Sequence, residues 1–296
     1  MPAKTSSSQN SICSETLKVY RCLFCDSVRV IKWCKRKTNN EVKQRYKCKD
    51  CNKLFTINDG FYRMKKSKEL ITGCLDLYFN GMSLRKIRQH IRQFTPQGVS
   101  HMSVWRWIMR YSRIVKSFTD SLTPTLSGIY HADEIFVNCK GQQEYFWDMV
   151  DKGTRFLVST HYSTKRNSFN ARMLFKKAKH RPLTVFTDGL QGYRKAFRKT
   201  WGTRYAKDKV EYIRLKADKD KRNNIIERIQ GTIRERIKVI RGFKQSLNAE
   251  ITLNLFCVWY NYIRIHQGIK RTPAEIADIA LPLKQNKWLS LIELSC

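Results

Sequence analysis

Three acidic side chains in the second half of the chain occur where a lone carboxylate is hard to explain. Asp133 lies within the apolar run 129–137, Asp188 directly follows the β-rich run 183–187, and Glu227 lies in a helical pattern. Burying a carboxylate without a partner is unfavourable. Three converging carboxylates also repel one another, whereas two divalent ions about 4 Å apart remove that repulsion and activate both oxygens of a phosphodiester exchange. Magnesium prefers such oxygen ligands.

The helix that contains Glu227 has two distinct faces. Its isoleucines form one stripe, which predicts packing against a sheet. A separate face carries a carboxylate followed by cations, as a site for metal and phosphate requires: Glu227, Arg234, Lys238 and Arg241. Glu134 is expected on the opposite strand face from Asp133, and Glu235 is the weaker candidate for the third acid. Taken alone, each of these acids is equally compatible with a surface salt bridge.

Two C-x-x-C pairs near the N-terminus predict a metal site of another kind. They are formed by Cys22, Cys25, Cys48 and Cys51. Each short gap lets a tight turn aim two sulfurs at one ion, and four thiolates complete the tetrahedron that zinc prefers. A redox motif is the alternative, but it would not come doubled. We predict a zinc ribbon over 18–60 with one structural zinc ion, which supplies most of the folding free energy of so short a segment.

The segment between the two cysteine pairs is rich in cations that are candidates for contact with DNA phosphates. They are Lys32, Lys35, Arg36, Lys43, Arg45 and Lys47. The alternative is a zinc-stapled spacer without a binding role.

Residues 61–120 have the pattern of a helix-turn-helix domain. Ser83 caps the second helix of the pattern, and a further serine caps a third helix over 104–114. The start of the last helix of this motif enters the major groove of DNA, so Arg106 and Arg110 are expected to contact DNA. A three-helix module without DNA recognition is the alternative.

The charge of the chain indicates its partner. Fifty-eight Lys+Arg face 24 Asp+Glu, which leaves a net charge of +34. Such an excess calls for a polyanion, and no segment has the length and apolar character of a membrane anchor or a secretion signal. We therefore expect double-stranded DNA as the partner and a cytoplasmic, nucleoid-associated location of prokaryotic type. A hydrophobic content of 42% excludes a disordered chain, apart from the polar tail expected over 1–17.

Strands and helices alternate after residue 128, which predicts an α/β fold with a mixed sheet. Three strands joined by tight turns form an antiparallel meander, and later strands alternate with helices. The expected strands are 129–137, 145–150, 156–162, 183–187 and 210–213, and the expected helices are 171–179, 193–201 and the helix of Glu227. This order matches the ribonuclease-H-like fold. We assign it to residues 121–280, followed by a C-terminal tail over 281–296.

Short motifs over residues 128–279 resemble the insertion-sequence transposases of the DDE type, in particular the insertion-sequence-six family. The motifs are Ala132-Asp133-Glu134, Thr187-Asp188-Gly189, Asn223 to Arg228, Gly231 to Arg236, Arg241-Gly242-Phe243, Tyr260 to Gln267 and Thr272 to Glu275. The resemblance implies that Asp133, Asp188 and Glu227 bind two Mg²⁺ ions, for which Mn²⁺ can substitute. A metal-bound water then hydrolyses one DNA strand, and the freed 3′-OH attacks target DNA.

The resemblance also implies roles for cations. Lys238 and Arg241 hold phosphates, and Arg264 and His266 support the site, with side-chain packing as the alternative for His266. We expect a transposase that binds the terminal repeats of its element and acts at least as a homodimer, because two ends are handled together. The alternatives are a non-catalytic DNA-binding repressor and a nuclease of the same fold.

Overall fold

The computed structural model describes residues 20–37, 42–202, 209–215 and 224–296. The chain divides into two compact units, residues 1–58 and 59–296. The polar tail expected over 1–17 lies outside the described residues. Among the described helices, none combines the length and the apolar character needed to span a membrane.

The first unit is a three-stranded antiparallel sheet with a very small core. Its strands, in the order β1-β2-β3, are β1 (Val30–Lys37), β2 (Val42–Cys48) and β3 (Leu54–Phe55). In the described part of this unit, the buried apolar side chains are Cys22, Tyr46, Cys48 and Phe55. The free energy gained from burying so few apolar side chains does not offset the conformational entropy that the segment loses on folding. The unit therefore requires an additional source of stability.

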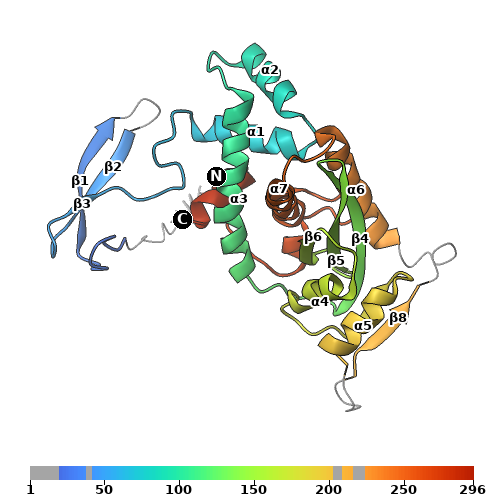
Figure 1. The fold of residues 1–296 in the computed structure, drawn as a ribbon. Coiled ribbons are helices and arrows are strands. Elements are labelled where there is room, and N and C mark those ends of the chain that lie inside the picture. The colour runs from blue at the N-terminus through green and yellow to red at the C-terminus, as the bar shows by residue number, and fades with distance from the viewer. Residues whose placement is uncertain (1–19, 38–41, 203–208, 216–223) are drawn as a thin grey trace, which may run out of the picture. The chain divides into compact units, whose positions relative to one another are not determined.

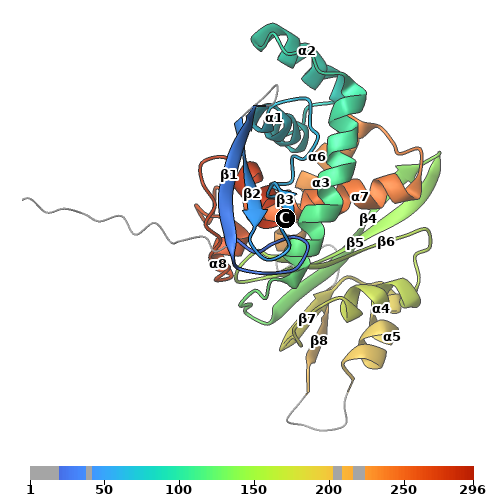
Figure 2. The ribbon, with the colours of Figure 1, turned by 90° about the vertical axis from the view of Figure 1, so that its left-hand side faces the viewer.

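The second unit contains a five-stranded mixed sheet in the order β6-β5-β4-β7-β8. Its strands are β4 (Ile129–Cys139), β5 (Gln142–Asp151), β6 (Leu157–Ser163), β7 (Thr184–Thr187) and β8 (Glu211–Arg214). Strands β4, β5 and β6 follow one another in the chain and form an antiparallel meander. Strands β7 and β8 run parallel to β4. This is the strand order of the ribonuclease-H-like fold, so the predicted fold class is confirmed (Figures 1 and 2).

Strand alternation places two different cores on the two faces of this sheet. One face carries Tyr130, Ala132 and Trp147 and packs against α4 (Ser168–Lys176) and α5 (Gln191–Thr200). The other face, which carries alternate residues such as Ile135, packs against further helices. These are α6 (Asn224–Ile240) and α7 (Ser246–Val258), which continues as the π-helical turn η3 (Trp259–Ile263).

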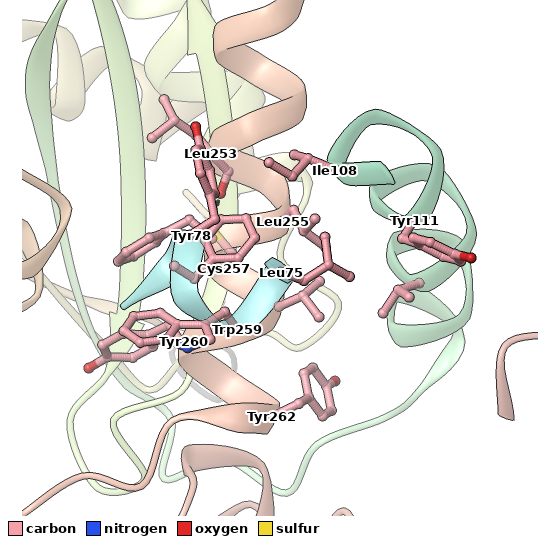
Figure 3. Packing of buried hydrophobic residues seen from close by; sticks show 14 of the residues in the cluster. Leu75, Tyr78, Ile108, Tyr111, Leu253, Leu255, Cys257, Trp259, Tyr260 and Tyr262 are labelled. Carbon is pink, nitrogen blue, oxygen red and sulfur yellow. Dashed lines mark hydrogen bonds between the residues drawn. The ribbon is translucent and has the colours of Figure 1, made fainter. Parts of the chain in front are cut away.

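The predicted helices of the helix-turn-helix pattern are present as α1 (Lys68–Phe79), α2 (Leu84–Phe94) and α3 (His101–Ser121). Each begins at a serine whose hydroxyl accepts a backbone N–H bond: Ser67, Ser83 and Ser100. The third helix is longer than the expected range 104–114. It packs on α7, where the Ser112 hydroxyl donates to the Ile251 carbonyl at 3.0 Å. The three helices therefore share one core with the sheet (Figure 3).

The expectation of a C-terminal tail over 281–296 is wrong. This segment contains α9 (Lys287–Leu294), which follows the short helix α8 (Pro273–Ile276). Trp288, Leu291 and Ile292 occur at helical spacing and are buried against α1. The Trp288 indole also donates to Asp76 Oδ1 at 3.3 Å. These apolar contacts hold the end of the chain in the core of the second unit.

A buried arginine connects α6 to the turn that follows α1. Arg236 is 2% exposed, and its guanidinium donates to the carbonyls of Tyr78 and Met82, the latter at 3.0 Å. The same guanidinium lies 3.7 Å from the centre of the Tyr78 ring. These contacts fix the position of α6, the helix that carries Glu227.

Replacing Arg236 with methionine keeps the bulk of the side chain, but it removes the donor to the Met82 carbonyl and one of the donors to the Tyr78 carbonyl, which also accepts the Gly81 N–H at 3.2 Å. We expect a loss of about 3 kcal/mol in the free energy of unfolding, measured by denaturant titration. The matched control is Lys238→Met on an exposed position of the same helix, expected to change stability by less than about 0.5 kcal/mol. Equal effects of the two substitutions would show that the buried contacts of Arg236 do not hold α6.

Candidate functional site

The parallel pairing of β4 with β7 brings two of the predicted acids together. Ala132 is the register partner of Thr187, so Asp133 on β4 and Asp188, the residue directly after β7, follow side by side. Carboxylate oxygens of Asp133, Glu134 and Asp188 all lie within 4.8 Å of one another. An oxygen cluster of this kind suits a hard divalent cation such as Mg²⁺.

Burial makes this cluster electrostatically unfavourable without a cation. Burial, and next the charge of Glu134, raises the pKa of Asp133 to about 7. Burial likewise raises the pKa of Glu134. Arg166, in the loop before α4, forms an ion pair with Glu134 and lies 3.7 Å from Asp188 Oδ2. One guanidinium thus faces a cluster of three carboxylates.

Glu134 joins this cluster, contrary to the expectation from strand alternation. Its side chain does extend toward α5, where the Tyr193 hydroxyl donates to Glu134 Oε2 at 2.7 Å. The Asp133 side chain is held close to the backbone, because its Oδ1 accepts the N–H of the next residue, Glu134, at 2.8 Å. The alternation of side chains along β4 fixes the direction of each Cβ. It does not fix how far a long carboxylate side chain extends, and β7 is short and ends beside these residues. Glu134 therefore reaches the cluster from the opposite face of the sheet.

A fourth carboxylate, Asp148, lies on β5 next to Asp133 and was not predicted from the sequence. It is the direct cross-strand partner of Asp133, so both side chains lie on the same face of the sheet. It is fully buried, and Gln230 of α6 donates to its Oδ1 at 3.3 Å. Burial, and next the charge of Asp133, raises its pKa well above the usual range. Its signal in the sequence was an acid within the apolar run 145–150.

The third predicted acid, Glu227, is not part of the cluster. It is exposed in the first turn of α6, which begins directly after residues 216–223, outside the described part of the chain. Gln230, which contacts Asp148, follows Glu227 by about one helical turn, or roughly 4.5 Å along the axis. Glu227 therefore lies about one turn before the residue of α6 that contacts Asp148, and its role as the third metal ligand stays a prediction.

The predicted cations of α6 differ in their relation to the acids. Arg234 donates to Gln230 Oε1 at 3.1 Å, which links it through Gln230 to Asp148. Its charge also acts to lower the pKa of Asp133, as the smallest of the contributions to that group. Lys238 is exposed, and Arg241 follows the end of the helix with a positive φ of 67°. Arg234 is thus the cation of this row that the structure ties to the carboxylates.

Arg264 and His266 lie against another side of α6 than the predicted acid. The Arg264 guanidinium donates to the Thr232 hydroxyl at 3.1 Å, and Thr232 is about 140° around the helix from Glu227. The His266 ring packs edge-on against Tyr260 at 4.4 Å between centroids. Burial, and next the charge of Arg264, lowers the pKa of His266 to about 4, so its imidazole is neutral at pH 7. The structure does not bring these two side chains to the acid cluster.

The two arginines predicted to contact DNA from the third helix are exposed. Arg106 and Arg110 alternate along α3 with the buried residues Trp107 and Ile108, as expected from the periodicity. Within the ribbon, Lys43 and Arg45 are partly buried on β2 and point to the side opposite Tyr46. Contact of these four cations with DNA stays a prediction.

The four predicted zinc ligands converge in the first unit. The Sγ atoms of Cys22 and Cys51 are 3.5 Å apart, as are those of Cys25 and Cys48, and all four lie within 4.8 Å of one another. A tetrahedral zinc with Zn–S bonds of about 2.3 Å requires sulfur separations of roughly 3.8 Å. The four thiols therefore fit one zinc ion.

Backbone N–H groups support the sulfurs within each knuckle. Phe24 N donates to Cys22 Sγ and Asp50 N donates to Cys48 Sγ, both at 3.4 Å. Backbone N–H bonding, chiefly from Cys51, lowers the pKa of Cys48 to about 7. Such N–H groups favour the thiolate, which is the form that binds metal.

The chain is similar to proteins of mobile DNA. Residues 127–266 match a protein-family model described as a DDE domain. An uncharacterized protein in transposable element ISH50 of Halobacterium salinarum is 25% identical over 199 residues, which cover 58% of this chain. The match spans 63% of the length of that relative.

Two solved viral structures are also similar. The catalytic core domain of HTLV-2 integrase in complex with magnesium is 17% identical, covers 53% of this chain and 98% of that chain, and has a TM-score of 0.39. The simian T-cell lymphotropic virus intasome in complex with PP2A regulatory subunit B56 gamma is 11% identical, covers 71% and 76% of the two chains, and also has a TM-score of 0.39. Because both TM-scores are low, the fold assignment rests on the observed strand order and not on these two structures.

The zinc site generates a direct prediction. Cys48→Ser removes one of the four ligands, so the purified protein is expected to lose its single zinc ion and the hydrogen-exchange protection of β2 and β3. The control is Cys34→Ser, an exposed cysteine of β1 outside the cluster, expected to keep both. Metal analysis and hydrogen exchange measure the two effects. Retention of zinc and protection by the Cys48 variant would contradict the assignment.

The acid cluster predicts how stability depends on pH and metal. Since the pKa of Asp133 rises from 3.8 to about 7 on folding, the folded state keeps a proton that the unfolded state releases. Stability without magnesium must then fall as pH rises from about 4 to about 7. We expect Mg²⁺ to raise the Tm at pH 8 by about 3 °C or more, and to have little effect at pH 5.

Asp133→Asn is the matched variant for this measurement, because asparagine keeps the shape of the side chain and removes its charge. Its Tm at pH 8 without magnesium should equal or exceed that of the wild type, and magnesium should no longer raise it. A metal-induced increase in Tm that survives in this variant would argue against ion binding by Asp133.

Proposed function

We propose, from the premise that residues 127–266 form a DDE domain of the insertion-sequence transposase type, that the protein is a metal-dependent DNA transposase. It binds the terminal repeats of its own element. It cleaves a DNA strand at each end and transfers the resulting 3′-OH into target DNA. The observation that carries this proposal is the convergence of Asp133, on β4, with Asp188, which directly follows the parallel neighbouring strand β7.

Asp133, Asp188 and Glu227 are the residues proposed to hold two Mg²⁺ ions, with Mn²⁺ able to replace them. When bound, the ions supply an activated oxygen nucleophile and stabilise the leaving oxygen of an in-line displacement. The raised pKa of Asp133 supports this assignment, because a divalent cation removes the charge repulsion that burial imposes. The position of Glu227 in the first turn of α6 lets its carboxylate approach the two aspartates from the face of the sheet that α6 covers.

Protein cations around the cluster position the DNA phosphate. Arg234, held by Gln230 beside the buried Asp148, contributes positive charge on the side of α6. Arg166, held by Glu134, contributes it on the side of α4. Lys238 and Arg241 extend the row of cations beyond Arg234 along the DNA backbone. Fixed guanidinium groups suit this task, because they bind phosphate oxygens in pairs.

Two further modules recognise DNA in this proposal. The zinc ribbon over 18–60 contacts phosphates through Lys43 and Arg45. The helix-turn-helix domain over 61–120 presents Arg106 and Arg110 to the major groove. Their exposure or partial exposure, and the net charge of +34, support these roles. The catalytic domain spans 121–280 and shares its core with the helices before it and with α9.

The active form is proposed to be a homodimer or a larger assembly, because two element ends must be cut and joined together. The partners are the double-stranded DNA of the ends and of the target, and the protein acts on the nucleoid of a prokaryotic-type cell. No membrane partner is involved.

Strand cleavage and joining on a labelled element end with Mg²⁺ tests this function. Asp188→Asn and Glu227→Gln should each lower the rate of both steps by at least about 1000-fold, because each removes a ligand of the ions that stabilise the transition state. DNA affinity should change little. Glu235→Gln, an exposed acid on the same helix, is the control and should stay within about threefold of the wild type.

Each alternative outcome has a distinct meaning. Binding of the end without cleavage by the wild type would favour a repressor, and cleavage without joining or end specificity would favour a nuclease. Full activity of Glu227→Gln together with loss in Glu134→Gln would move the third acid from α6 to β4.

A further inference from the structure

A second group of cations lines a pocket of about 460 Å³ beside α6. The cations are Arg155, Arg228 and Arg264, and His266 lies among them. Among the described residues, none that lines this pocket is acidic. Like charges gathered without a counter-charge repel one another, so the pocket is suited to an anion.

The cations come from three separate segments of the fold. Arg228 is on α6, Arg155 is in the turn between β5 and β6 with a positive φ of 63°, and Arg264 directly follows η3. Within the described part of the chain, no ion pair joins any of the three to a carboxylate. Arg264 is oriented by its bond to the Thr232 hydroxyl and by the Trp259 ring, 5.4 Å from its guanidinium carbon.

The motif Tyr260 to Gln267 builds one wall of this pocket. The Asn261 side chain accepts the Leu157 N–H at 2.9 Å and donates to the Leu157 carbonyl at 3.1 Å, which fastens the motif to β6. Arg264 and His266 are thereby held facing α6. His266 is neutral at pH 7, so it offers a hydrogen bond and not a charge. The opposite wall belongs to α6, at Arg228 and Thr232.

The pocket and the acid cluster lie on different sides of α6. Glu227 does not line the pocket, and Thr232, which does, is about 140° around the helix from it. Arg234 and Lys238 share the side of Glu227, about 20° from it in each direction. A DNA strand whose phosphate reaches the aspartates along that side is therefore not the strand that fills the pocket.

We propose that this pocket is a second phosphodiester-binding site, which holds the backbone of a DNA strand other than the one being cut. This inference rests on the proposed transposase function and adds to it. The converging guanidinium groups supply paired N–H donors for phosphate oxygens. Gly268 at the rim leaves room for a backbone to approach, because a Cβ built there meets no atom within 4 Å.

The primary test measures binding of a labelled DNA duplex without divalent metal, as a function of KCl concentration. Arg228→Gln and Arg155→Gln each remove one pocket cation, whereas Lys199→Gln removes an exposed cation of α5 as a control. Loss of a phosphate contact lowers the slope of log affinity against log salt by about 0.9. We expect this decrease for both pocket variants and not for the control. Unchanged slopes in both pocket variants would overturn the proposal.

A second arm separates a DNA backbone from a free anion. Inorganic phosphate, added at matched ionic strength, should compete weakly with DNA in the wild type. If it abolishes the difference between wild type and Arg228→Gln at low millimolar concentration, the pocket is a site for the free ion and the proposal fails. Thermal unfolding of each variant checks that the substitutions leave the fold intact.

The third arm identifies the strand. With saturating end DNA and Mg²⁺, joining to target DNA should fall at least tenfold more than end cleavage in Arg228→Gln. Equal losses would place the cut strand in the pocket and overturn that part of the proposal. If the wild type cuts no DNA at all, the transposase function fails, and the salt slopes alone then decide whether the pocket binds DNA.

Discussion

The electrostatic cost of gathering carboxylates at the junction of β4 and β7 is the constraint on which this structure depends. Parallel pairing forces Asp133 and Asp188 to neighbouring positions, and burial raises the pKa of Asp133 to about 7. Glu134 and Asp148 add two more carboxyl groups to the same region. The sheet would be more stable with apolar side chains in place of these buried carboxyl groups. The proposed binding of a divalent cation accounts for their presence, as in sites where stability is given up for function.

Helix α6 connects this centre to the rest of the second unit. On one side Gln230 reaches the buried Asp148, on another Arg236 is bonded to the turn after α1, and on a third Thr232 holds Arg264. Movement of this helix would change all three contacts together. The side that carries Glu227 and the side that lines the pocket of Arg155, Arg228 and Arg264 are therefore fixed relative to one another, as the proposed binding of two DNA strands requires.

Much of this arrangement follows from local sequence patterns. Alternation and serine caps predict the strands and helices, and the match to a DDE domain and to a transposable-element protein confirms the resemblance carried by the motifs. Contacts between distant segments could not be predicted. The reach of Glu134 depends on the length of β7, the burial of Asp148 depends on its pairing with Asp133, and α9 packs on α1, α3 and η3, which are distant from it in the sequence.

Asp133 on β4 and Asp188, directly after β7, are proposed to bind divalent ions jointly. Titration of the zinc-loaded protein, in complex with end DNA, with Mn²⁺ and detection of free Mn²⁺ by electron paramagnetic resonance counts the ions bound. The account predicts two Mn²⁺ per chain for the wild type and at most one for Asp188→Asn. Equal numbers of bound ions in the two proteins would contradict it.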